Sequence, residues 1–391
     1  MSSHPYRNVA IAGVFNTAQA RRLAGQSTAS IQVAACMGVL DLCGSRREDI
    51  DGIVGQAGPD LAYLLGLGPI WASPDPLGIS GVMTAADAIA AGHCASVLVV
   101  GGCAGLSATI GSADQGLLHR AGNEFVSSVG MYTAVEFALI ARRHMATYGT
   151  TSEQIARVSS TIRNNGHVNP EAVFYNRGPY TIEDVLASRM VADPFHLLDC
   201  AIPAEGACAI LLTTADRAQD LRLPPVYLLG AQQDYFGAPY THAPSWDLRS
   251  FNGGPDDCIG MVGHRAANQC FELVGLGPPD VDVLELYDPF SFEIIRQFEA
   301  FGFCKPGEGG GFVMDGNMDP SGAFPTNTDG GLLSYSHNYT GQTHQKVGRC
   351  VQQLQGICAT TQIPGAEVAM ASNGGAGASW CWVALLGNER P

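Results

Sequence analysis

Two short stretches of the second half of the sequence hold side chains that can move protons. The first is YDPF (287–290), and the second is YSHNY (335–339), which contains a histidine between two tyrosines. A phenol can donate a proton, or accept one when neighbouring groups lower its pKa. Isolated tyrosines and histidines more often have a packing role, so these residue types permit acid–base chemistry without proving it.

The twelve cysteines offer little support for metal or nucleophilic chemistry. None belongs to a C-x-x-C pair, so we expect no metal site in this chain. Most of them lie in apolar stretches such as VAACMGVL (33–40) and SWCWVALL (379–386). We therefore predict small buried side chains in a reducing compartment.

Charge and hydropathy exclude two classes of partner. The net charge is −15 with histidine neutral, and no Lys/Arg-rich run occurs. Nucleic acid and anionic membranes are therefore poor partners. The start of the sequence does not match a secretory signal, and the apolar stretches are too short to span a bilayer. We expect a cytoplasmic protein.

Alternating strands and helices must position these side chains. A chain of 391 residues exceeds the ~250–300 residues at which single cores split, so we expect two halves. Short apolar runs and helical spacing predict strands and helices in alternation, which indicates a sheet covered on both faces. In the first half these are strands at 8–14, 51–55, 96–102 and 207–214, and helices at 27–43 and 81–93. In the second half they are strands at 225–232, 281–290, 367–375 and 378–387, and helices at 261–275, 290–303 and 341–356.

Two regions depart from this alternation. Residues 130–200 read as a mainly helical excursion, with helices predicted at 133–148, 152–165 and 182–188. The glycine-rich stretch 307–331 reads as a loop.

Three passages resemble the thiolases of the sterol-carrier-protein and lipid-transfer-protein type. They are residues 141–170 with 188–213, residues 285–310, and residues 327–356. The resemblance implies an α/β thiolase fold: two βαβαβαββ halves in a five-layered αβαβα arrangement, with a helical loop domain and usually a dimer. We place the first half at 1–224, including a loop domain at about 120–200, and the second half at 225–391.

The nucleophile of the family has no counterpart here. Thiolases carry a cysteine at the start of a buried helix, where the helix dipole favours the thiolate. In PDPLGISGVM that position falls on Gly78, which has no side chain to acylate. The second thiolase cysteine maps near Ser372, in ASNGGAGAS.

Other parts of the family's site persist in altered form. The resemblance places His337 where thiolases have the histidine of G-H-P-x-G, which helps to hold the thioester oxygen. Tyr287 replaces the histidine of an H-D-C-F motif. The resemblance thus implies catalytic roles for Tyr287, Tyr339 and His337, with Tyr335, Asp288 and Ser372 as supporting candidates.

A site that keeps residues for binding a thioester but lacks a nucleophile indicates retro-aldol cleavage of a β-hydroxyacyl-CoA, because that reaction needs no acyl-enzyme. The chain is similar to the cysteine-less aldolases of steroid side-chain degradation. That resemblance implies a steroid CoA thioester as substrate and a small OB-fold, zinc-ribbon partner around a homodimer core, giving a heterotetramer. CoA is then part of the substrate, and zinc is expected only in the partner.

Two alternatives stay open. One is a thiolase or acyltransferase that uses an unaligned cysteine such as Cys94 or Cys103. The other is a non-catalytic protein that binds acyl-CoA and acts as a scaffold. The CoA-contacting residues are not predicted.

Overall fold

The computed structural model describes residues 4–55, 57–75, 77–105, 130, 132–235, 261–375 and 379–391. Nine strands within these ranges form one mixed sheet, in the order β3-β2-β4-β7-β1-β8-β11-β10-β9. In chain order they are β1 (Val9–Asn16), β2 (Gly52–Val54), β3 (Trp71–Ser73), β4 (Ser96–Cys103), β7 (Gly206–Thr214), β8 (Val226–Tyr235), β9 (Val283–Glu285), β10 (Val368–Gly374) and β11 (Trp380–Gly387).

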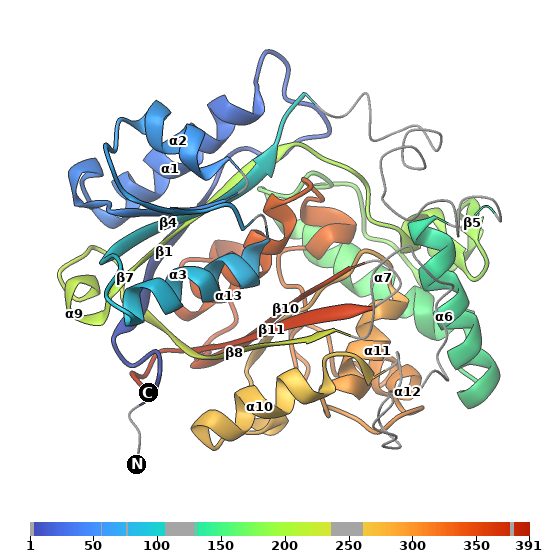
Figure 1. The fold of residues 1–391 in the computed structure, drawn as a ribbon. Helices are drawn as coiled ribbons and strands as arrows, with labels where there is room; N and C mark the ends of the chain where they lie inside the picture. The colour runs from blue at the N-terminus through green and yellow to red at the C-terminus, as the bar shows by residue number, and fades with distance from the viewer. Residues whose placement is uncertain are drawn as a thin grey trace.

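The helices stack with this sheet in five layers (Figure 1). Helices α1 (Thr28–Cys43) and α2 (Gly58–Leu65) cover the outer side of the first half. Helices α10 (His264–Val274) and α11 (Phe292–Ala300) cover the outer side of the second half. Between the halves lie α3 (Gly78–Ala90) and α13 (Gly341–Leu354). The αβαβα arrangement expected from the sequence is confirmed.

Strand connectivity follows the expected plan in the first half, which runs β1-α1-β2-α2-β3-α3-β4 and closes with β7. The second half runs β8-α10-β9, then α11 and α13, then β10-β11. Its third strand is reduced to one parallel bridge between Leu284 and Thr326. The halves meet where Ala10 and Ile11 of β1 pair with β8. The division of the chain at 224/225 stays a prediction.

The helical excursion lies between β4 and β7 in the sequence. It contains α6 (Thr133–Tyr148), α7 (Ser152–Val168) and α8 (Ile182–Ala187), and a small hairpin of β5 (Met190–Ala192) and β6 (Phe195–His196). A buried pair joins α6 to the second half, since the Nε2 atom of His144 lies 3.0 Å from a carboxylate oxygen of Glu299. Among the described helices of the chain, none has the length and apolar character needed to cross a membrane.

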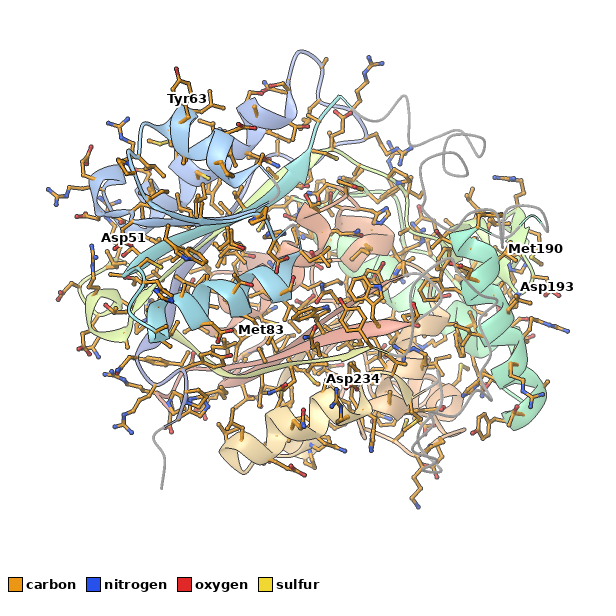
Figure 2. All side chains as sticks on the ribbon, in the orientation of Figure 1. Asp51, Tyr63, Met83, Met190, Asp193 and Asp234 are labelled. Carbon is orange, nitrogen blue, oxygen red and sulfur yellow. The ribbon has the colours of Figure 1, made fainter. Side chains whose placement is uncertain are left out.

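Local signals explain why some helix bounds were predictable. Ser27 caps the start of α1 by accepting the N–H of Ser30, and Gly44 ends it with φ +72°. The start of α10 has no such local cap, because the carboxylate that accepts the N–H groups of Gly263 and Ala266 comes from Asp234 on β8 (Figure 2).

Three local predictions were wrong. Helix α3 begins at Gly78 instead of residue 81. A short strand, β3, was missed, and the predicted loop at 307–331 contains the helix α12 (Gly309–Met314). The early start of α3 has a tertiary cause, because the N–H of Gly78 donates to the hydroxyl of Thr343 on α13, at 2.7 Å.

The starts of α3 and α13 pack backbone against backbone. A Cβ atom added at Gly78 would lie 2.2 Å from the carbonyl carbon and oxygen of Thr343 and 2.4 Å from the nitrogen of His344. Gly341 makes a similar approach, because its Cβ would lie 2.9 Å from Cα of Gly102 on β4. Side chains are therefore excluded where the middle layer meets the first half of the sheet.

We expect Gly78→Ala to lower the free energy of unfolding by about 1–3 kcal/mol, the usual cost of overpacking a filled core. Urea titration followed by circular dichroism measures this change. Gly311→Ala in α12 is the matched control, because a Cβ there meets open space. Equal stability of the two variants would contradict this account of the packing.

Candidate active site

Tyr287 follows β9 and is 8% exposed. Its backbone N–H donates to the hydroxyl of Ser372, at 2.9 Å, and its carbonyl accepts the side-chain amide of Gln297, at 2.7 Å. The hydroxyl of Ser372 in turn donates to the amide oxygen of Gln297. Ser372, which the resemblance places near the second thiolase cysteine, thus holds the backbone of Tyr287. The role of Gln297 on α11 was not predicted from the sequence.

Asp288 is fully buried and connects three segments. Its carboxylate lies 2.7 Å from Nζ of Lys346 on α13 and accepts the N–H groups of Leu332, at 3.0 Å, and Leu333, at 3.3 Å. Burial raises the pKa of Asp288, and the charge of Lys346 opposes that rise. For Lys346, burial lowers the pKa, but Asp288 and nearby carboxylates outweigh it and raise the pKa. Asp288 therefore links the loop after β9 to the backbone of Leu332 and Leu333 and to Lys346 on α13.

Further buried charged residues lie beside the ion pair of Asp288 and Lys346. Glu285, at the end of β9, accepts the N–H and the hydroxyl of Thr328 on one oxygen. Burial, with Asp329 beside it, raises the pKa of Glu285 to about 8, while Lys346 and Arg349 act in the opposite direction. This cluster was not predicted from the sequence.

Residues 336–344 belong to the second half but are held by the first. The hydroxyl of Ser336 and the amide of Asn338 both donate to the Oε1 atom of Gln19, at 2.8 and 2.9 Å. The N–H of Gly102 donates to the hydroxyl of Thr340, at 3.0 Å. This segment therefore keeps its position only while the halves are packed together.

His337 lies within this segment and is half-buried. Its backbone carbonyl accepts the N–H of Ala204, at 3.0 Å. Its Nδ1 atom is buried and has no hydrogen-bond partner among the described residues. Burial lowers the pKa of His337 to about 4, so the ring is neutral at neutral pH. A neutral imidazole can still donate one hydrogen bond to a substrate oxygen.

Tyr339 has a different environment, being 54% exposed. Its φ is +60°, in the left-handed region. That conformation costs a non-glycine residue roughly 1–3 kcal/mol and is concentrated at functional sites. The hydroxyl of Thr340, the next residue, accepts the N–H of Gly102, so the backbone is held on one side of Tyr339.

Tyr335 is 3% exposed, unlike Tyr339. Its carbonyl accepts the N–H of Val173. Burial raises the pKa of Tyr335 well above 10, so its hydroxyl remains protonated. This environment favours packing over proton transfer.

Two further residues, at the start of α13, were not predicted from the sequence. The hydroxyl of Thr343 accepts the N–H of Gly78 and donates to the carbonyl of Thr340, at 3.1 Å. His344 is fully buried, and its Nδ1 atom lies 2.9 Å from the same carbonyl. Its Nε2 atom has no partner within the described ranges, and burial lowers its pKa to about 4. Thr343 therefore links the start of α3 to the start of α13.

The cysteines kept as alternatives are poor nucleophiles. Burial raises the pKa of Cys94 and of Cys103 to about 11, so both thiols remain protonated at neutral pH. The described cysteines are buried, apart from the half-buried Cys304. Cys258 lies outside the described residues.

We expect His337 and His344 to lower the free energy of unfolding as the pH is lowered from 6.5 to 4, while Glu285, whose raised pKa lets the folded chain bind the proton, acts in the opposite direction. Burial depresses the folded-state pKa of His337 and His344 to about 4, so in this window only the unfolded chain binds their protons. These two histidines together take up about two protons on unfolding, so the test is the difference in slope between the wild-type protein and a histidine variant. Urea titrations at several pH values measure the slope.

His344→Gln should reduce this slope by about one proton, whereas His93→Gln, which alters an exposed histidine, should leave it unchanged. A slope unaffected by His344→Gln would contradict the assignment.

Comparison with known proteins agrees with this architecture. Residues 255–388 match a family described as thiolase C-terminal domain-like. A steroid side-chain-cleaving aldolase of Thermomonospora curvata is 38% identical over 217 residues, covering 54% of this chain and 53% of that protein. The 17-hydroxy-3-oxo-4-pregnene-20-carboxyl-CoA lyase of Mycobacterium tuberculosis is 38% identical over 237 residues, covering 60% and 58%. The matched region spans little more than half of these relatives.

A solved structure described as an Ltp2-ChsH2(DUF35) aldolase covers 98% of both chains, with a TM-score of 0.83 and 28% identity. The fold, the matched second half and these relatives agree with the resemblance in the sequence. The chain is similar to the thiolase superfamily, and within it to the sterol-carrier-protein type and its steroid side-chain aldolases.

Proposed function

We propose that this protein is a carbon–carbon lyase that cleaves a β-hydroxyacyl-CoA by a retro-aldol reaction, without a covalent cysteine intermediate. One observation carries the proposal. Gly78, which the resemblance places at the thiolase nucleophile position, is closed by the backbone of Thr343 and His344, so no side chain fits there. Thiolysis requires an acyl carrier, and retro-aldol cleavage does not.

In this reaction a base removes the proton of the β-hydroxyl group. The oxygen forms a carbonyl as the Cα–Cβ bond breaks, and the bonding electrons move into the thioester as an enolate. A proton delivered to Cα then gives the shortened acyl-CoA. The products are one ketone or aldehyde and one acyl-CoA, so atoms and electrons balance without a redox partner.

We assign His337 to the thioester oxygen, where charge develops, because a neutral imidazole in a buried setting is a good donor for an enolate. We assign Tyr287 and Tyr339 to the two proton transfers. Tyr339 is exposed on a pinned, left-handed backbone, and Tyr287 is held by Ser372 and Gln297. Tyr335 takes no part in proton transfer in this scheme, and Asp288 acts as a brace.

We propose a CoA thioester of a steroid side chain as the substrate, supported by the names of the two curated relatives. We also propose a small OB-fold, zinc-ribbon partner, supported by the similar solved structure, which pairs Ltp2 with ChsH2(DUF35). In the assembly proposed for this protein, two copies of this chain form a homodimer core and the partner holds the zinc. This chain then needs no cofactor besides the CoA of its substrate. A cytoplasmic location fits these roles.

A thiolase or acyltransferase that uses another cysteine is the principal rival. The raised pKa values of Cys94 and Cys103 weigh against it. Iodoacetamide discriminates: retained cleavage after complete alkylation supports the aldolase, whereas loss of cleavage prevented by substrate supports the rival. A scaffold would bind acyl-CoA, with or without the partner, and never release a carbonyl product.

Tyr287→Phe and Tyr339→Phe should each lower kcat by about 10²–10⁴-fold, because each removes one proton-transfer group. The assay incubates the protein, with and without the partner, with tertiary β-hydroxyacyl-CoA substrates and quantifies the ketone and the shortened acyl-CoA. Tyr175→Phe, on an exposed tyrosine of the loop domain, is the control. Near-normal turnover by both site variants would contradict the assignment of proton transfer to these tyrosines.

His337→Ala should lower kcat by about 10²–10³-fold through the loss of an oxyanion donor. His337→Gln keeps a side-chain N–H and should restore part of the rate. The activity of the wild-type protein should not depend on protonation of His337 above about pH 5, because burial lowers the pKa of this ring to about 4. Wild-type turnover by His337→Ala would exclude the assigned role.

A further inference from the structure

Three consecutive residues centred on His337 are all bound by the first half of the chain. The hydroxyl of Ser336 and the side-chain amide of Asn338 donate to one and the same atom, Oε1 of Gln19. Between them, the backbone carbonyl of His337 accepts the N–H of Ala204. The backbone of His337 is therefore held at its own carbonyl and on both sides, and the contacts on both sides depend on one amide oxygen.

Hydrogen bonds within the first half orient the amide of Gln19. Its Nε2 atom donates to the carbonyl of Thr17, at 2.8 Å, and to the carbonyl of Ala207, at 3.4 Å. A reversed amide would place its N–H groups against the N–H groups of Asn338 and its oxygen against two carbonyl oxygens. The amide therefore presents its oxygen, and not its nitrogen, to the second half.

A glycine makes room for this amide. A Cβ atom at Gly206, the first residue of β7, would lie 2.1 Å from Oε1 of Gln19 and 2.4 Å from its amide carbon, so the side chain of Gln19 lies directly on the backbone of Gly206. The next residue, Ala20, exchanges two backbone hydrogen bonds with Glu205. Residues 203–206 thus pair with Ala20 through Glu205 and with the segment of His337 through Ala204.

The imidazole of His337 depends on this backbone for its direction. Its Nδ1 atom is buried and makes no hydrogen bond to the described residues, so no side chain of that part of the chain fixes the ring at this nitrogen. A donor stabilises developing charge only when it is placed accurately, and a misplacement of about 1 Å can cost about 10²-fold in rate. The contacts that hold residues 336–338 therefore decide how well the ring can serve the reaction.

We infer that Gln19 is a positioning residue, which directs the ring of His337 toward the thioester oxygen by holding the residues on both sides of it. The inference rests on the proposed retro-aldol function. Gln19 does not touch the substrate in this scheme and acts through Ser336 and Asn338. Because Gln19 belongs to the first half and His337 to the second, the oxyanion donor is in place only when the two halves are packed together.

Gln19→Met keeps nearly the length and volume of the side chain and removes its hydrogen bonds. With the partner and a tertiary β-hydroxyacyl-CoA, this variant should lower kcat about 10–100-fold and change KM less than about twofold, because the misplaced donor acts mainly in the transition state. Gln219→Met, on an exposed glutamine of the first half, is the control and should keep the wild-type kcat. A raised KM with an unchanged kcat for Gln19→Met would overturn the inference.

A double-mutant cycle tests whether the effect passes through Oε1 of Gln19. Ser336→Ala removes one of the two donors to this atom and should lower kcat about 2–10-fold, which corresponds to one hydrogen bond. In the Gln19→Met protein the same change should cost less than about 1.5-fold, because the accepting oxygen is already absent. Losses that simply multiply would contradict the inference. A wild-type kcat for Ser336→Ala would overturn it even if Gln19→Met does not fold, which circular dichroism and thermal unfolding verify.

Failure of the proposed function is distinguishable from failure of the positioning role. If the wild-type protein, with its partner, cleaves no β-hydroxyacyl-CoA, the retro-aldol proposal fails. Amide hydrogen exchange then tests the positioning alone. Gln19→Met should speed exchange about tenfold or more in peptides that cover 203–206 and 336–340, and leave peptides of α10 unchanged. Wild-type exchange in the first two peptides would overturn the role of Gln19.

Discussion

The contact between the first turns of α3 and α13 is the constraint on which the candidate site depends. At Gly78 the two backbones approach so closely that no side chain fits, and the N–H that opens α3 is given to Thr343. In a thiolase-like site the start of this helix would stabilise a thiolate. Here the neighbouring helix occupies that place. Through its hydrogen bond to the carbonyl of Thr340, Thr343 also helps to hold the segment that carries Tyr339.

The two tyrosines assigned to proton transfer are held by opposite halves of the molecule. Tyr287 is fixed within the second half by Ser372 and Gln297. The segment of Tyr339 is fixed by Gln19 and Gly102 of the first half. The buried ion pair of Asp288 and Lys346 joins the loop after β9 to α13 and so couples the two arrangements. A retro-aldol reaction needs two proton transfers at opposite ends of one breaking bond, and a junction between halves can present groups to both.

Much of the architecture was predictable from the sequence, because capping residues and apolar periodicity are local signals. Ser27 and Gly44 define α1, and the repeated strand–helix order gives the five layers. The start of α3 was not predictable, since its cap is supplied by Thr343 from 265 residues away along the chain. The burial of Lys346 was also hidden, because a lysine on a polar helix face reads as solvent-exposed until the opposing Asp288 is known.

Residue type alone did not decide which candidates can do chemistry. Tyr335 and Tyr339 are four residues apart, yet one is buried with a raised pKa and the other projects from a strained backbone. Likewise, burial keeps His337 neutral, so its ring can donate a hydrogen bond to an oxygen but does not hold an extra proton at neutral pH. Under the proposed function, the same neutral donor serves an enolate as it would serve a thioester carbonyl, because both place negative charge on one oxygen. A change of reaction then requires only that the nucleophile be excluded and that tyrosines supply the protons.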